Sequence, residues 1–260
     1  MKKWLSLAVV SMLVVGILAA CGTKDEKTSG DGKKVLTMGT SADYKPFEYV
    51  DTKNGEEPIG FDIDLANAIA KKLGYEVEVQ DMDFGGLIPA IQADQVDFVM
   101  AGMTPTEKRK KNVDFTDVYY TAKDVIITPK NSGIKSVDDL KGKTIGVQAS
   151  SIQEDKAKEL NKTTKFKIEN RNRIPDIIQE IKSDRFDGAI IEDTVAKGYL
   201  DKEKDLTGIV ISDDKEDEAG SAIAFPKDSK LTKDFNRVLN EMKENGELDK
   251  LIVKWFGGDQ

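Results

Sequence analysis

The side chains best suited to hold a small charged molecule stand at turns, each close to a segment with the pattern of a strand. Arg109 lies in AGMTPTEKRKK, and the fork of an arginine matches a carboxylate bidentately. Ser151 lies between a strand-like and a helix-like segment, where the N-terminal amides of a helix favour an anion. Asp193 follows AIIE, which has the pattern of a buried strand, and can accept an ammonium group, while Tyr44 and Phe84 are suited to flank a ligand side chain.

Each of these residues also has a purely structural explanation. Arg109 is one of four basic residues in EKRKK, which suits a solvated helix face. Ser151 and Asp193 can cap the helices that follow them, and the two aromatic residues can belong to the core. No single residue is specific. Together they place an anion clamp, a cation acceptor and aromatic walls on successive strand ends, which is what a zwitterionic amino acid requires.

The composition excludes several other chemistries. The 260 residues include no histidine and one cysteine, so Ser-His-Asp and Cys-His pairs, imidazole metal sites and intrachain disulfides are excluded. The net charge of −8 argues against nucleic acid, which needs a basic face. The composition therefore excludes histidine- and thiolate-based catalytic and metal sites and argues against a nucleic acid partner. With the resemblance given below, we expect no catalytic residues, no metal and no cofactor.

The N-terminal segment has the features of an export signal. Met1-Lys2-Lys3 precedes an apolar stretch at 4–20, and the chain turns polar directly after Leu18-Ala19-Ala20-Cys21. A membrane anchor helix is the alternative, but Leu-Ala-Ala-Cys resembles a bacterial lipobox, in which the cysteine is acylated after cleavage. We predict a signal peptide at 1–20, a lipidated (palmitate-type) Cys21, a flexible tether at 21–34 and a protein anchored to the outer face of the cell membrane.

From residue 34 onward, strand-like and helix-like segments alternate, which is typical of α/β proteins with parallel sheets. Apolar or alternating runs predict strands at 34–40, 76–82, 96–103, 118–130, 187–193 and 221–226, the last as an edge strand of the first sheet. Helical spacing predicts helices at 60–74, 87–96, 152–160 and 173–184, and a final pair over 231–257 that is broken at Gly246.

The pattern predicts two sheets in two lobes. Extended segments around 119–122 and 217–221 would cross between them, so lobe 1 would comprise 35–120 and 221–260, and lobe 2 would comprise 121–220. Two crossings imply a hinge and a cleft. Because ligands bind at the carboxyl ends of strands in open α/β sheets, the cleft should be lined by the turns at 39–46, 101–109, 149–153 and 192–194.

From about residue 34 to 256 the chain resembles the polar amino acid substrate-binding proteins of ABC importers. The segments GFDIDLANAIAKKLG, VDFVMAGMTPTEKR, LKGKTIGVQASSIQ and FDGAIIEDT carry this resemblance. It implies a type II periplasmic-binding-protein-like fold with two hinge strands and the ligand in the interlobe cleft. It also implies a monomer without enzymatic activity that closes on a free amino acid and docks on the transmembrane subunits of a permease. A dehydratase-type enzyme on the same fold and a sensory receptor domain are the other classes considered.

The resemblance also implies roles for individual residues. Arg109 would clamp the ligand α-carboxylate, Asp193 would accept the α-ammonium, and Tyr44 and Phe84 would sandwich the side chain. The remaining backbone contacts would come from the turns around two strand ends, namely Ala101, Gly102, Met103, Thr104, Ser151 and Ile152.

Recognition of the ligand side chain departs from the family pattern. Ser41 stands where the glutamine and histidine binders carry an aspartate, and the family turn Gly-Thr-Thr is replaced by Ser150-Ser151-Ile152. A guanidinium stacks on aromatic faces and needs several acceptors. The expected acceptors at the side-chain end are Ser41, Asp43, Glu48, Gln148, Gln153 and Glu192. The wider pattern most resembles arginine-binding members from Gram-positive bacteria, so arginine is the expected ligand, with glutamine or another polar amino acid as the alternative.

Overall fold

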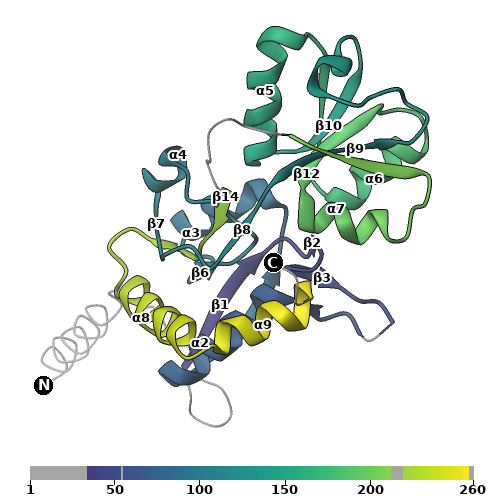
Figure 1. Cartoon of the computed structure of the whole chain (residues 1–260). Helices are drawn as coiled ribbons and strands as arrows, with labels where there is room; N and C mark the ends of the chain where they lie inside the picture. The colour runs from purple at the N-terminus through teal and green to yellow at the C-terminus, as the bar shows by residue number, and fades with distance from the viewer. Residues whose placement is uncertain (1–33, 54, 212–218, 258–260) are drawn as a thin grey trace, which may run out of the picture.

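The computed structural model describes residues 34–53, 55–211 and 219–257. The predicted signal peptide, Cys21 and nearly all of the tether lie outside these residues. The described chain forms two α/β lobes joined by a pair of extended strands (Figure 1).

The first lobe is built on a five-stranded sheet of order β5-β1-β6-β15-β7. Its strands are β1 (Lys34–Thr40), β5 (Tyr75–Asp81), β6 (Phe98–Val99), β7 (Val113–Phe115) and β15 (Ala224–Pro226). β5, β1 and β6 run parallel, whereas β15 pairs antiparallel with both β6 and β7. The prediction of an edge strand at 221–226 was therefore wrong: β15 lies inside the sheet and β7 forms its edge.

Helices cover both faces of this sheet. α2 (Phe61–Leu73), α8 (Lys230–Glu244) and α9 (Glu247–Phe256) pack together, and Phe98 and Phe225 belong to the apolar cluster on that face. Val99, which follows Phe98 in β6, and Ala224, which precedes Phe225 in β15, pack on the opposite face with α3 (Leu87–Gln92). This alternation is the period of two that a strand imposes on its side chains.

The second lobe repeats the arrangement, with a sheet of order β11-β10-β12-β9-β13. Its strands are β9 (Asp124–Pro129), β10 (Thr144–Gln148), β11 (Lys167–Arg171), β12 (Gly188–Glu192) and β13 (Leu206–Val210). β11, β10 and β12 are parallel, and β9 pairs antiparallel with β12 and β13. Both sheets are thus mixed rather than purely parallel as predicted. α5 (Ile152–Thr164) packs on one face, and α6 (Ile174–Lys182) and α7 (Asp193–Leu200) pack on the other.

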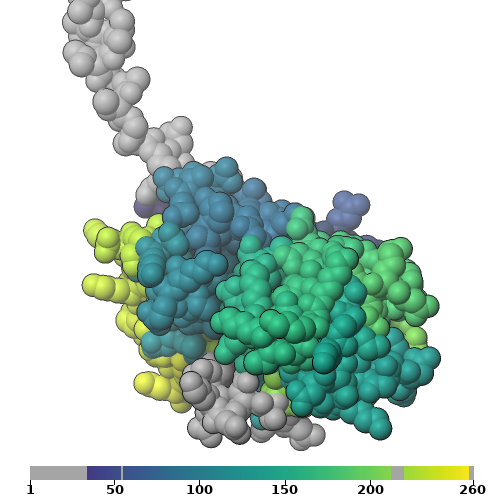
Figure 2. All heavy atoms as spheres, turned by 90° about the horizontal axis from the view of Figure 1, so that it is seen from above, coloured from purple at the N-terminus to yellow at the C-terminus, as the bar shows by residue number. Residues whose placement is uncertain are grey.

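Two short strands join the lobes. β8 (Tyr120–Ala122) pairs antiparallel with β14 (Ala219–Ser221), with Tyr120 opposite Ser221. Tyr120 also stacks on Phe256 of α9 with ring centroids 4.1 Å apart, which ties the C-terminal helix to this connection. From above, the second lobe covers part of the first (Figure 2).

The smaller elements bring functional segments to the lobe boundary. A three-stranded sheet of β2 (Asp43–Tyr44), β3 (Glu48–Val50) and β4 (Pro58–Ile59) follows β1. Short helical turns occur at η1 (Phe84–Gly86), α4 (Glu107–Lys110) and η2 (Val137–Leu140). In the part of the chain described here, no helix has the length and apolar character needed to cross a bilayer.

Candidate ligand-binding site

A cavity lies between the lobes. Its wall is formed by residues at the carboxyl ends of parallel strands in both sheets, as the topology predicts for ligand sites of open α/β folds. The lining residues are Tyr44, Phe84, Ala101, Gly102, Thr104, Arg109, Gln148, Ser151, Ile152, Gln153 and Glu192. All eleven of these residues were named from the sequence, and Gln148, Gln153 and Glu192 were named there as acceptors for the ligand side chain.

Arg109 is buried, although its basic neighbours in the same helical turn are exposed. Its side chain is 8% exposed, whereas Lys108, Lys110 and Lys111 face solvent. The guanidinium donates to Thr104 O at 2.8 Å through Nη1 and to Ser150 O at 2.9 Å through Nη2. Its carbon lies 5.2 Å from the centroid of the Phe84 ring. Burial lowers the pKa of Arg109 to about 10, so the side chain stays cationic at neutral pH.

The turn after β6 approaches the aromatic wall closely. Gly102 has φ of +55°, and a Cβ at this position would lie 3.1 Å from the Tyr44 ring. Its N–H donates to Asp62 Oδ2 at 2.9 Å, so only its carbonyl is left for a ligand. Met103, which the resemblance placed at the site, is instead 1% exposed in the apolar cluster around α3 and does not line the cavity.

The second lobe contributes the turn that starts α5. Ser150 adopts a left-handed conformation with φ of +65°, and Ser151 is the N-cap of the helix. The Ser151 hydroxyl accepts from Glu154 N at 3.1 Å and donates to Gln148 O at 2.7 Å. Ser151 therefore both caps the helix and lines the cavity, so its capping role does not exclude a position in the ligand site.

The acidic residue in the cavity is Glu192 and not Asp193. Glu192, the last residue of β12, is 2% exposed, and its Oε2 has no hydrogen-bond partner among the residues that the structure describes. The pKa of the Glu192 carboxyl is raised to about 8, mainly because the group is buried. The Tyr44 hydroxyl lowers this pKa, and the nearby charge of Asp124 raises it further. Asp193 is absent from the cavity lining, and its Oδ1 accepts from Lys123 N at 3.2 Å and Thr194 N at 2.8 Å.

Three acceptors predicted for the side-chain end do not line the cavity either. The Ser41 hydroxyl donates to Asp43 Oδ1 at 2.7 Å, and Asp43 Oδ2 accepts from Ile174 N at 2.6 Å. Glu48 is completely buried next to Asp62, and burial followed by the charge of Asp62 raises its pKa well above the ordinary range. The acceptors that do reach the cavity are the amides of Gln148 and Gln153, together with Glu192.

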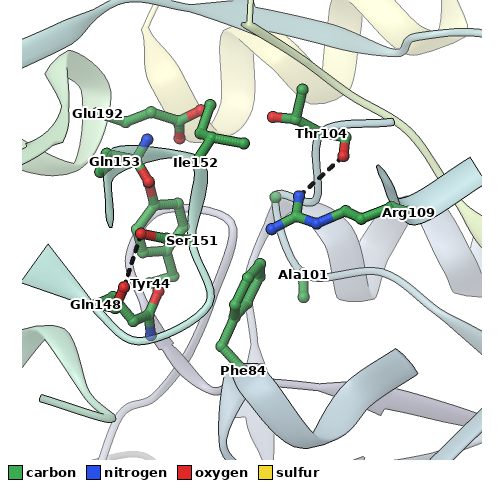
Figure 3. A pocket seen from close by; sticks show the side chains of 11 residues that line it. Tyr44, Phe84, Ala101, Thr104, Arg109, Gln148, Ser151, Ile152, Gln153 and Glu192 are labelled. Atoms are coloured by element: carbon green, nitrogen blue, oxygen red, sulfur yellow. Dashed lines mark hydrogen bonds between the residues drawn. The ribbon is translucent and has the colours of Figure 1, made fainter. Parts of the chain in front are cut away.

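The guanidinium and the buried carboxyl group of the cavity lie on opposite sides of it. Figure 3 shows the Glu192 carboxyl group and the Arg109 guanidinium on opposite sides of the pocket, with Tyr44 on the side of Glu192 and the Phe84 ring at the lower border. Gln153 lies beside Glu192, and its Nε2 donates to Asp124 Oδ1 at 2.8 Å. No group of three or more carboxylate or thiol side chains that could hold a metal ion occurs within residues 34–53, 55–211 and 219–257.

Comparison with known proteins identifies the family. Residues 36–258 match the bacterial extracellular solute-binding proteins, family 3. The chain is 60% identical over 260 residues to the arginine-binding extracellular protein ArtP of Bacillus subtilis (strain 168), with all of both chains covered. It is 48% identical, with a TM-score of 0.81, to a crystal structure of the substrate-binding protein of an amino acid ABC transporter, covering 85% of this chain and 99% of that chain. An ancestral arginine-binding protein bound to arginine has a TM-score of 0.79 and 41% identity, covering 86% of this chain and 98% of that chain.

These matches confirm the predicted two-lobed type II fold and the predicted relationship to amino acid-binding proteins. The chain belongs to the bacterial extracellular solute-binding proteins, family 3.

Proposed function

We propose that this protein binds free L-arginine between its two lobes and delivers it to the permease of an ABC importer. The observation that carries the proposal is the position of Arg109 and Glu192 on opposite sides of one interlobe pocket that Tyr44 and Phe84 also line (Figure 3). The pocket is concave and lined by both aromatic and polar side chains, which suits a small ligand with a charged backbone and a polar side chain.

The α-carboxylate of the ligand would bind to Arg109. The guanidinium uses one contact to each lobe, Thr104 O in the first and Ser150 O in the second, and it has five N–H donors in total. The remaining donors suit a carboxylate in a site from which water is largely excluded. The Thr104 and Ser151 hydroxyls are further polar groups of the cavity wall.

The α-ammonium would bind to Glu192, in place of the Asp193 that the resemblance implied. Glu192 has a buried carboxyl oxygen without a hydrogen-bond partner among the described residues. A buried acceptor without a partner costs free energy, and a donor from the ligand would remove that cost. Asp193 already accepts two backbone N–H groups outside the cavity. A cationic group next to Glu192 would also favour its charged form.

The ligand side chain would lie against Tyr44 and Phe84, and its end would meet the amides of Gln148 and Gln153. A planar guanidinium is suited to this combination of aromatic faces and oxygen acceptors. The 60% identical relative that is named an arginine-binding protein supports the same ligand. Glutamine is the second candidate, because Gln148, Gln153 and Ser151 are neutral and serve a terminal amide equally well.

The surrounding roles follow from the same proposal. The lobes would be 35–120 with 221–260 and 121–220, hinged at β8 and β14, and closure would expose a surface for the permease. The protein would act as a monomer without catalytic turnover. Cys21 would carry a lipid that holds it at the outer face of the cell membrane.

A thermal-shift panel of the twenty amino acids, followed by calorimetry of those that respond, tests the ligand. A ligand at a hundred times its dissociation constant stabilises the folded state by about 2.7 kcal/mol. This corresponds to a rise in Tm of about 2–4 °C for a chain of this size. Arginine should give this shift. If only glutamine or an acidic amino acid gives it, the arginine assignment is wrong, and if no amino acid does, the proposed function is wrong.

Lipid attachment is tested separately with Cys21→Ser, with Ser6→Ala as a matched change inside the predicted signal peptide. Cys21→Ser should abolish metabolic labelling with palmitate and leave the ligand affinity of the purified protein unchanged, whereas Ser6→Ala should alter neither. Retained labelling after Cys21→Ser would contradict the lipoprotein assignment.

A further inference from the structure

Arg173, a residue of the second lobe that does not line the cavity, inserts its side chain among three carboxylates of the first lobe. Its Nη1 lies 2.8 Å from Asp81 Oδ1 and its Nη2 lies 3.3 Å from Asp81 Oδ2, so the pair is bidentate. Its Nε donates to Asp83 Oδ1 at 3.0 Å. Asp43 Oδ1 lies 3.5 Å from Nη1. A single guanidinium therefore neutralises three acids that are 90 to 130 positions away in the chain.

The residues on either side of Arg173 reinforce this contact. Asn172 Nδ2 donates to Asp83 Oδ2 at 2.7 Å, and Ile174 N donates to Asp43 Oδ2 at 2.6 Å. Ile174 is the first residue of α6, whose own N-cap residue forms no side-chain cap. The first lobe thus supplies, through Asp43, an acceptor that a helix N-terminus normally obtains from its own chain segment.

The first lobe holds its carboxylates in place independently of the second. Asp81 ends β5, and its Oδ1 accepts from Ala42 N at 2.8 Å. The Ser41 hydroxyl binds Asp43 Oδ1, and Asp83 precedes η1. Separation of the lobes would leave these acids close together without their cation, and like charges at such distances repel each other. The charge arrangement therefore favours the closed form over the open form.

We propose that Arg173 is a positioning residue for ligand binding: its contacts with Asp43, Asp81 and Asp83 form an interlobe latch that sets how long the closed complex lasts. The latch adjoins the site through Asp43, which directly precedes the cavity residue Tyr44. Residues 172–174 themselves do not line the cavity. The latch should therefore slow the dissociation of every ligand by the same factor and should not select among ligands.

Arg173→Met removes the cation and keeps much of the apolar stem. Because most affinity changes within one interface come from the dissociation rate, the variant should release ligand about tenfold faster with a nearly unchanged association rate. The Arg173 side chain is 25% exposed and Asp83 is 50% exposed, so salt should weaken the latch. Added salt should speed release from the native protein and have little effect on Arg173→Met.

Arg171→Met is the matched control. Arg171 lies two positions earlier, and its Nη2 donates to Glu180 Oε1 at 2.8 Å within the second lobe. The Arg171→Met substitution removes the same charge from the same region and leaves the interlobe contact intact. The ligand dissociation rate of this variant should therefore stay within twofold of the native value. Asp83→Asn offers a second variant in case Arg173→Met folds poorly, and it should also speed release. Arg173→Lys should restore part of the native rate.

The first readout is stopped-flow dissociation of L-arginine and of one other amino acid that binds, and this readout rests on the proposed function. The second readout is small-angle X-ray scattering of the ligand-free protein, which does not depend on the proposed function. Loss of the latch should raise the radius of gyration for Arg173→Met but not for Arg171→Met. The proposal is overturned if Arg173→Met leaves release within twofold of the native rate, if Arg171→Met has the same effect, or if the factor differs between the two ligands. If native protein binds no amino acid, the proposed function fails, and the scattering comparison alone decides for or against the latch.

Discussion

Replacement of Arg109 by alanine tests the central contact of the proposed site. The guanidinium is 8% exposed, remains cationic with a pKa of about 10, and reaches both lobes through Thr104 O and Ser150 O. Removing one partner of a buried charge pair costs about 2–5 kcal/mol, because the other charge is left without compensation. The dissociation constant of every amino acid ligand should therefore rise by about 30-fold to several thousandfold.

The two carbonyl contacts of Arg109 contribute differently. The contact to Thr104 O lies within the first lobe and is lost with or without ligand, so its loss lowers the free energy of unfolding rather than the affinity. The contact to Ser150 O joins the two lobes, so its loss also disfavours closure and adds to the loss of affinity. Isothermal titration calorimetry measures the affinity, and denaturation without ligand measures the stability. Arg109→Lys should retain part of the affinity, because it keeps the charge and loses the fork.

Lys110→Ala is the matched control for Arg109→Ala. Lys110 lies in the same short helix, is exposed and pairs with Glu107 at 2.9 Å, so its loss should change affinity by less than twofold. A loss of less than threefold for Arg109→Ala, or equal losses for both variants, would show that Arg109 does not bind the ligand and would refute the reasoning.

Three other changes test the remaining parts of the site. Glu192→Gln should weaken all amino acids by about 1.5–3 kcal/mol, since it removes a charged hydrogen-bond acceptor. Because the pKa of Glu192 is about 8 in the empty pocket and a bound cation favours its charged form, native protein should release protons on binding at pH 7, and its association constant should rise with pH up to about 8. Calorimetry in buffers of different ionisation enthalpy should show this release and its absence in Glu192→Gln; a pH-dependent Glu192→Gln would contradict the assignment. Gly102→Ala should lower the free energy of unfolding by about 1–2 kcal/mol, because φ is +55°, and should weaken binding by displacing Tyr44, while Gly86→Ala, which has open space around it, should do neither. The pKa of Asp62 is raised from 3.8 to about 6, first by burial, so the folded state holds more protons than the unfolded state between these values. Its contribution to the free energy of unfolding should therefore fall as pH rises from about 4 to 6, and denaturation of Asp62→Asn should lack that fall.

Local sequence patterns were sufficient for the elements that carry the site. The apolar spacing of 60–74 predicted α2, and Gly74 ends it in a left-handed conformation with φ of +81°. Gly246, with φ of +74°, separates α8 from α9 as predicted. The turns after β1, β6, β10 and β12 were predicted to line one cleft, and each contributes at least one residue to the cavity or its border. These features depend on periodicity, turn chemistry and the rule that ligands bind at the carboxyl ends of strands, all of which act over short stretches of chain.

The order of strands was less accessible. The antiparallel placement of β15 between β6 and β7, and of β9 between β12 and β13, depends on which segments meet after a long excursion of the chain. A short apolar run such as 221–226 has the same pattern at the edge of a sheet as inside it. The sequence therefore indicated that a strand exists there but could not assign its neighbours.

By itself the sequence determined the class of this protein, a two-lobed α/β binding protein, because the alternation of elements and the residue types at strand ends are local properties. The tertiary structure decided which acid enters the cavity. Glu192 ends β12 and lines the cavity, whereas the adjacent Asp193 begins α7 and accepts backbone N–H groups outside the cavity. It also decided that Asp43 faces Arg173 of the other lobe rather than a ligand. The two are 130 positions apart, and only the closure of the lobes, which no local pattern encodes, brings their charges together.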